Sequence, residues 1–243
     1  MLIDEKFKQS GLFLFRWRGY LPLIFLGATF ATQYFSHSAR GGHFDDARWA
    51  IICLLVGFAG ILIRIAAVAF VPYMTSGRGT SHPYAERLNT SGMYSIMRNP
   101  VYFGNFFTFL APVLFVRHFW LLVLYLPVFA LYHERIIFAE ESFLREKFGQ
   151  EYEEWAKRTP IFFPDLSLWR KPDLPFSWKM AVRRECISVF TLVITVWALK
   201  ITEYYLDHKA LNIDPAWLAL FSLSGAIYLS VALIVQFSDR LDR

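Results

Sequence analysis

Long apolar stretches are the feature that most constrains the fold of this chain. A helix needs about 20 mostly apolar residues to cross the hydrocarbon layer of a membrane, and hydrophobic residues make up 56% of the 243 positions. The apolar stretches, each expected to form a membrane helix, cover roughly residues 20–35, 47–72, 101–116, 119–132, 186–206 and 215–237. The sequence therefore predicts an all-α fold, a polytopic transmembrane bundle with about six spans.

Two of these stretches, 101–116 and 119–132, are short for full spans. They are separated only by Arg117 and His118. A tight helical hairpin that does not cross the membrane straight is therefore an alternative to two complete spans.

The distribution of positive charge predicts the orientation of the bundle. Most of the 25 Lys and Arg residues fall in the N-terminal segment, the loop 73–100, the region 133–185 and the C-terminal tail. Positive residues gather in cytoplasmic loops, so we expect both termini and both long loops in the cytoplasm. This asymmetry also accounts for the net charge of +5, and we expect no nucleic-acid partner.

The two long cytoplasmic segments are the regions polar enough to hold a water-soluble ligand. The loop 73–100 is rich in Gly, Ser and Thr, as loops are. The second segment opens with helical spacing over 132–147, which predicts a helix that leaves the membrane, and 151–158 predicts another short helix. We expect the functional site, with its binding loops and short helices, on this cytoplasmic face.

Two motifs lie in these segments. The first reads GMYSIMRNPVYFG over residues 92–104, and the second is Glu140-Glu141 followed by FGQEY at 148–152. In this combination and order they resemble the isoprenylcysteine carboxyl methyltransferase and phospholipid methyltransferase superfamily. The chain departs from that family at Asn99, where the family usually has His. Because Asn can donate a hydrogen bond but cannot titrate, a proton-carrying role at this position is not expected.

The resemblance implies an enzyme, an integral membrane methyltransferase that uses S-adenosylmethionine and releases S-adenosylhomocysteine. It covers roughly residues 47–165, which we interpret as the methyltransferase core. Residues 1–46 would then form an N-terminal segment with the first membrane helix. Residues 166–243 would form a connection and a C-terminal transmembrane hairpin.

The chemistry of S-adenosylmethionine suggests roles for the motif residues. Its cationic and diol groups need carboxylates, its carboxylate needs donors, and its adenine needs apolar walls. Pro100 suits the first turn of a helix, and Gly104 allows a close approach of another helix or of the ligand. The expected cofactor-binding residues are Gly92, Tyr94, Arg98, Asn99, Pro100, Tyr102, Gly104, Glu140 and Glu141. Arg98, Glu140 and Glu141 are also the expected catalytic residues, and no metal site is expected.

Each of these residues also has a purely structural interpretation. Arg98 to Pro100 could be a juxtamembrane basic residue followed by a helix start, and Glu140-Glu141 could be a solvated helix face. Tyr94 and Tyr102 could be aromatics of the membrane interface. The joint occurrence of both motifs favours the methyltransferase interpretation.

A second resemblance concerns the methyl acceptor. The FRWR sequence at 15–18 and the segments 75–80 and 88–92 are similar to the bacterial lipid A 1-phosphate methyltransferases. This resemblance implies a location in the bacterial inner membrane. Guanidinium groups bind phosphate or carboxylate through paired hydrogen bonds. The expected substrate-binding residues are Arg16, Arg18, Arg64 and Arg78. Arg64 lies inside an apolar stretch, where a site role and simple snorkelling to the interface are both open.

The expected reaction is an in-line displacement in which an ionised lipid headgroup, lipid A phosphate first, takes the methyl group. A prenylcysteine carboxylate or a phospholipid amine is the alternative acceptor. An alternative of another class is a non-catalytic membrane transporter or assembly protein. It would not bind S-adenosylmethionine.

Overall fold

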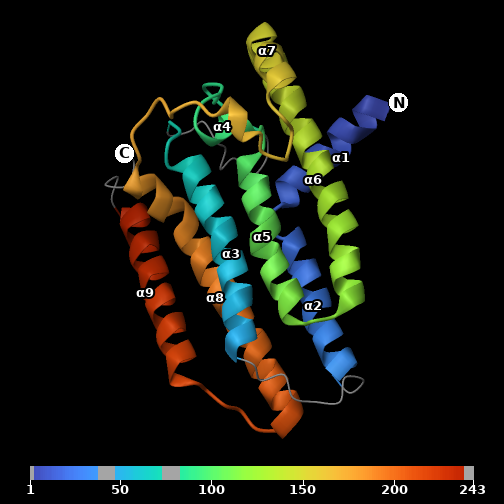
Figure 1. The fold of residues 1–243 in the computed structure, drawn as a ribbon, viewed down its shortest axis with the longest axis vertical. Helices are drawn as coiled ribbons and strands as arrows, with labels where there is room; N and C mark the ends of the chain where they lie inside the picture. Colours follow the sequence, from blue (N-terminus) through green and yellow to red (C-terminus); the bar gives the residue numbers. More distant parts are fainter. Residues whose placement is uncertain (1–2, 38–46, 73–82, 238–243) are drawn as a thin grey trace.

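The computed structural model describes residues 3–37, 47–72 and 83–237, and these ranges contain helices but no β-strand. The helices are α1 (Ile3–Trp17), α2 (Leu21–His37), α3 (Ala47–Val68), α4 (Met93–Ile96), α5 (Pro100–Phe115), α6 (Phe119–Phe148), α7 (Gln150–Arg158), the short 3₁₀ helix η2 (Leu166–Leu168), α8 (Trp178–His208) and α9 (Pro215–Phe237). Figure 1 shows them as a bundle of long helices with the short ones gathered at one end. The predicted all-α membrane bundle is confirmed.

Each of the six predicted apolar stretches forms a helix. Among the described residues, α3, α6, α8 and α9 are long and apolar enough to cross a membrane by length and composition, and α5 is a shorter apolar helix of 16 residues. α5 and α6 are joined by a tight turn in which Arg117 has a φ of 53°. The pair therefore forms a tight hairpin, although α6 is itself long enough to cross a membrane; whether the hairpin crosses straight stays a prediction. α6 continues without a break for 30 residues, so the predicted membrane segment and the predicted emerging helix are one element.

The N-terminal segment forms a helix that the charge pattern alone did not predict. α1 lies beside the part of α6 that extends toward α7 (Figure 1). The Arg135 guanidinium sits 3.4 Å from the centre of the Phe7 ring, and Lys8 pairs with Glu146. Gly11 permits this contact, since a Cβ there would collide with the carbonyl oxygen of Arg135. α1 is thus held by its packing on α6.

Close backbone contact between α3 and α5 forms the centre of the bundle. A Cβ added to Gly104 would lie 2.6 Å from the carbonyl oxygen of Gly60, and one added to Gly60 would collide with Gly104 in turn. Two helices can approach this closely only where side chains are absent. α8 packs on the same pair through Leu192 and Val196, which are buried in the core.

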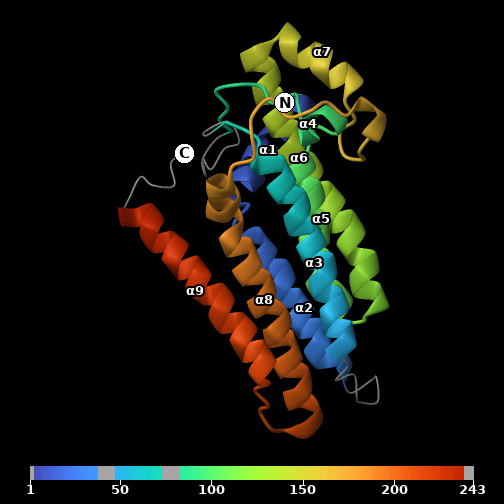
Figure 2. The same cartoon turned by 60° about the vertical axis from the view of Figure 1, so that its left-hand side comes forward.

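The short helices and the turns between helices lie at different ends of the bundle. α1, α4 and α7 lie at the same end as the last described turn of α9, whereas the α5–α6 turn lies at the other (Figure 1). Figure 2 shows α9 on the outer side of α8, at the edge of the bundle. The described parts of the two long loops, residues 83–100 and 149–177, thus lie at one end of the bundle, while the assignment of that end to the cytoplasm stays a prediction.

Candidate functional site

A cavity of about 900 Å³ opens among the helices. Its lining changes in character along its length. Near α4 and α7 it is lined by charged and aromatic residues, including Arg98, Glu140 and Glu141, and farther along the helices it is lined by apolar ones such as Phe25 and Phe109. A cavity with one polar end and one apolar arm is suited to an amphiphile.

The first motif reaches this cavity because the segment around Pro160 holds it. The Arg98 amide donates to the carbonyl of Pro160 at 2.8 Å, and the Asn99 side chain donates to the carbonyl of Ile161 at 3.0 Å. Pro100 then occupies the first turn of α5, as predicted. Asn99 is the N-cap residue of α5, but its side chain does not cap the helix. Its amide instead ties the motif to the connection after α7.

Arg98 and Glu141 form the first polar centre of the cavity. Arg98 Nε lies 3.2 Å from Glu141 Oε1, and both side chains are mostly buried. This ion pair is not aligned as a hydrogen bond. Within the described part of the chain, Arg98 Nε, Glu141 Oε1 and the Tyr152 hydroxyl are buried atoms without a hydrogen-bond partner. Since buried polar groups are normally satisfied, these three atoms are candidates to bind a polar ligand.

α7 closes this centre from the outside. Tyr152 is fully buried, and burial together with the nearby Glu141 carboxylate raises the pKa of its hydroxyl above the usual range. Trp155 Nε1 donates to the carbonyl of Tyr94 at 3.0 Å, which joins α7 to α4. Burial also raises the pKa of Tyr94 to about 12. Both phenols therefore stay neutral at physiological pH and can donate hydrogen bonds.

Glu140 forms a second polar centre with Arg18. The two side chains approach to 3.6 Å between Arg18 Nη1 and Glu140 Oε1. Tyr102 of α5 and Tyr132 of α6 line the same cavity as Arg18. The Tyr132 hydroxyl is buried without a hydrogen-bond partner among the described residues. Adjacent carboxylates on α6 thus face two different arginines, and they divide the polar end of the cavity into two halves.

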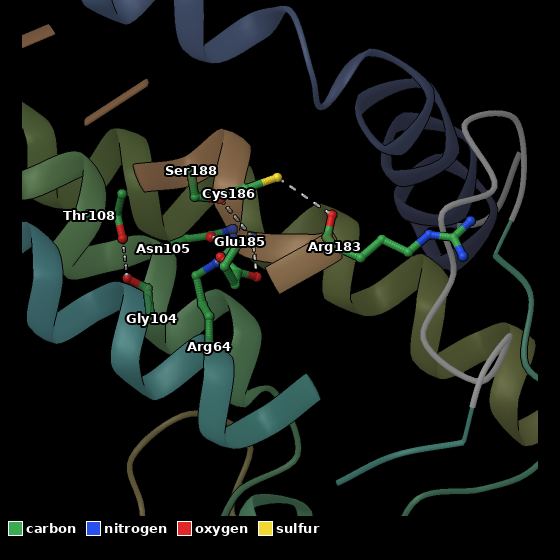
Figure 3. Close-up of polar contacts among 8 residues, drawn as sticks. All are labelled: Arg64, Gly104, Asn105, Thr108, Arg183, Glu185, Cys186 and Ser188. Carbon is green, nitrogen blue, oxygen red and sulfur yellow. Dashed lines mark hydrogen bonds and ion pairs between the residues drawn. The ribbon is translucent and has the colours of Figure 1, made fainter. Parts of the chain in front are cut away.

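Arg64 lies on the cavity wall in a cluster shown in Figure 3. Its Nε donates to Glu185 Oε2 at 2.8 Å and its Nη2 donates to Glu185 Oε1 at 3.0 Å. Asn105 and Ser188 accept from its other N–H groups. Snorkelling therefore does not describe Arg64, because its guanidinium is held inside the bundle. These contacts use four of its five N–H groups and leave one Nη1 donor beside the cavity.

The structure distributes the other predicted site residues unevenly. Tyr94, Asn99, Pro100 and Tyr102 line the cavity along with the residues described above. Three predicted site residues lie elsewhere, and one falls outside the described residues. Gly92 has a φ of 59°, and its amide donates a hydrogen bond to the carbonyl of Arg170. Gly104 packs on α3, and Arg16 is exposed and does not line the cavity. Arg78 lies in the range that the structure does not describe.

Some cavity residues were not predicted from the sequence. Tyr152 belongs to the FGQEY segment, so the second motif contained a signal for it. Glu185 was a lone carboxylate beside the fifth apolar stretch, and its pairing with Arg64 depends on the packing of α8 against α3. Tyr132 and His133 lie at the start of the segment 132–147, whose spacing predicted a helix but did not indicate that these two side chains face a cavity.

Comparisons with known proteins give one family and two relatives. Residues 49–151 match the family described as phospholipid methyltransferase. The chain is 31% identical over 131 residues to the nickel-cobalt-cadmium resistance protein NccN of Alcaligenes xylosoxydans xylosoxydans. The aligned region covers 53% of this chain and 59% of that protein. The chain is 32% identical over 141 residues to the cobalt-zinc-cadmium resistance protein CzcN of Cupriavidus metallidurans, covering 58% and 60%. The matches thus span about three-fifths of each relative, and no solved structure matches.

Proposed function

We propose that this membrane protein transfers a methyl group from S-adenosylmethionine to an anionic lipid, because residues 49–151 match the phospholipid methyltransferase family. The observation that carries the proposal is the divided polar end of the cavity. Glu141 faces Arg98 while Glu140 faces Arg18. One half suits a polar cofactor and the other suits a charged headgroup.

The half around Arg98 fits S-adenosylmethionine, which supplies an electrophilic methyl group on a sulfonium when bound. The buried atoms without partners have the required chemistry. Arg98 can donate to a carboxylate, and Glu141 can accept from an ammonium or a ribose hydroxyl. The neutral Tyr152 hydroxyl adds a further donor, and the Tyr94 ring offers an apolar wall. Low solvent access strengthens all of these interactions.

The half around Arg18 fits the headgroup of the acceptor. A guanidinium binds phosphate through two parallel hydrogen bonds, and the hydroxyls of Tyr102 and Tyr132 add donors on the same side. The apolar arm lined by Phe25, Phe109 and other residues would take the hydrocarbon chains. The preferred acceptor is therefore a lipid phosphate, with lipid A phosphate first because of the FRWR sequence.

The protein contributes alignment more than proton transfer. An ionised phosphate oxygen forms the new bond to the methyl carbon as the carbon–sulfur bond breaks, and it loses its negative charge without releasing a proton. No residue is needed as a base. The arginines hold the two substrates in line, and the buried site excludes water. An amine acceptor would instead require a base, and Glu140 would be the candidate.

The names of the two relatives state resistance to metal ions and not a reaction. They are compatible with a membrane enzyme whose product is a modified lipid. The choice of reaction therefore rests on the family and on the site.

The test is methyl transfer by the purified protein. S-adenosylmethionine labelled in its methyl group is supplied with lipid A, a prenylcysteine or phosphatidylethanolamine, and the lipids are analysed by mass spectrometry. We expect label on lipid A. Label on the prenylcysteine alone would show that the acceptor group is a carboxylate and not a phosphate. If calorimetry detects no binding of S-adenosylmethionine, the methyltransferase proposal is wrong and the transporter alternative gains support.

A further inference from the structure

α8 forms one wall of the cavity although it lies outside the region that matches the family. Ser188, Thr191 and Thr195 all line the cavity. Spacings of three and four residues place side chains on the same face of a helix. At a rise of 1.5 Å per residue, the three hydroxyls extend over about 10 Å along the apolar arm. The arm is therefore polar along one side.

The two deeper hydroxyls of this face are not used by the protein itself. Ser and Thr in helices commonly donate to the carbonyl four residues earlier, as Thr202 does to Ala198 at 2.8 Å and Thr108 does to Gly104. Thr195 is only 8% exposed, yet neither it nor Thr191 hydrogen-bonds to any residue that the structure describes. Thr191 is exposed and Thr195 lines the cavity, so both hydroxyls face space that a ligand can occupy. A ligand in the cavity would supply the partner.

The Arg64–Glu185 pair fixes the rotation of α8 that points this face into the cavity. Figure 3 shows Arg64 on α3 pointing to Glu185 on α8, with Asn105 of α5 beside them. Ser188, the first hydroxyl of the face, accepts from Arg64 Nη2 at 3.4 Å. Because Glu185 is 2% exposed, a rotation of α8 would leave a buried charge unpaired.

We propose that this face of α8 binds the carbonyl oxygens of acyl chains, so that the acceptor is an acylated lipid and not a polyisoprenyl compound. The inference rests on the proposed function for the presence of a lipid in the cavity. Ester and amide carbonyls lie close to a lipid headgroup, where the hydroxyl face begins. A polyisoprenyl chain has no hydrogen-bond acceptor and would leave both threonine hydroxyls unpaired. Thr191 and Thr195 are thus specificity-determining residues.

The test compares two phosphatidic acids that differ only in their chain linkage. One carries ester-linked acyl chains and the other carries ether-linked alkyl chains, so only the carbonyls differ. Lipid retention by the purified full chain is measured by native mass spectrometry. We expect the unmodified protein to retain the ester lipid about three- to tenfold better than the ether lipid, which corresponds to one hydrogen bond.

Matched variants separate the hydroxyls from general packing. Thr191→Val with Thr195→Val should bring the two lipids to near parity, whereas Thr191→Ser with Thr195→Ser should keep the preference. Thr202→Val, which removes a hydroxyl that α8 satisfies internally, should also keep it. Where the double Val variant fails to fold, Thr191→Val alone, at an exposed position, should reduce the preference. Equal retention by the unmodified protein, or an unchanged preference in the folded Val variants, overturns the inference.

Methyl transfer to the same two lipids distinguishes this inference from the proposed function. A carbonyl-dependent binding preference without methylation of either lipid would support the α8 face and argue against phosphate as the acceptor. Methylation of both lipids at the same efficiency, with equal retention, would support the phosphate acceptor and reject the α8 face.

Discussion

Arg98 Nε lies 3.2 Å from Glu141 Oε1, joining the loop before α5 to the emerging part of α6. Neither atom makes an aligned hydrogen bond to any described residue. Two mostly buried groups of opposite charge normally gain hydrogen bonds that offset their desolvation. Because their pairing is incomplete, Arg98 and Glu141 can each bind a group of opposite charge on a zwitterionic ligand.

The first prediction concerns this pair. Replacement of Arg98 by Gln or of Glu141 by Gln should weaken S-adenosylmethionine binding by about 1.5–3 kcal/mol, the usual contribution of a hydrogen bond to a charged group. Titration calorimetry on the detergent-solubilised protein measures it. Arg158→Gln is the control, because Arg158 is exposed and bonds within α7. If both site variants bind S-adenosylmethionine with the affinity of the unmodified protein, Arg98 and Glu141 do not bind the cofactor.

The second prediction distinguishes Arg16 from Arg18, which were both predicted from the sequence to bind the substrate. Arg18 lines the cavity and faces Glu140, whereas Arg16 is exposed and does not line it. Arg18→Lys should slow methyl transfer to a lipid phosphate and leave S-adenosylmethionine affinity unchanged, because Lys cannot form the paired hydrogen bonds of a guanidinium. Arg16→Lys should retain full activity. Equal rates for both variants would show that neither arginine binds the headgroup.

The structure explains which parts of the site the sequence could predict. The motif residues Arg98 and Glu141 were predicted and do meet, because the resemblance carries information about a three-dimensional arrangement. Gly92 and Gly104, which were predicted to bind the cofactor, do not line the cavity; Gly92 has a positive φ and Gly104 lies at the crossing of α3 and α5. A glycine in a motif does not reveal which close approach it permits.

The fold was predictable where one helix is defined by its own sequence. Long apolar stretches indicate membrane helices without knowledge of their neighbours. α1 was not predicted, since its amphipathic sequence is held by contacts with α6, such as Arg135 with Phe7. The position of Thr195 on the cavity wall could not be predicted either, because it depends on the path of the cavity beside α8.

The third prediction tests the contact between α3 and α5. Gly60→Ala or Gly104→Ala should lower the free energy of unfolding by about 1–3 kcal/mol, because the added Cβ forces two backbones apart. Gly27→Ala is the control, since a Cβ there meets nothing within 4 Å and alanine favours a helix by about 0.5–1 kcal/mol. Denaturant titration in mixed micelles measures all three. Equal stability of Gly27→Ala and Gly104→Ala would contradict the described crossing.

The fourth prediction concerns the buried pair that holds α8. Arg64→Leu or Glu185→Leu alone should lower the free energy of unfolding by about 3–5 kcal/mol, because each leaves the other charge buried and unpaired. The double variant should recover much of this loss, since neither charge is then left alone. Lys8→Ala, which breaks an exposed pair with Glu146, should cost no more than about 1 kcal/mol. Additive losses in the double variant would mean that the two side chains act independently.

The fifth prediction concerns orientation. Cysteine at the exposed Lys171, in the connection after α7, should react in intact cells only with thiol reagents that cross the membrane, because the positive charge of this region favours the cytoplasm. Cysteine at the exposed Asn212, in the α8–α9 turn at the opposite end of the bundle, should react with impermeant reagents as well. Both variants are made in a Cys186→Ala background, and Cys53 is buried. Labelling of position 171 by an impermeant reagent would show that the orientation is the opposite of the predicted one. The divided polar site would then face away from the cytoplasmic supply of S-adenosylmethionine, so the methyltransferase proposal depends on this result.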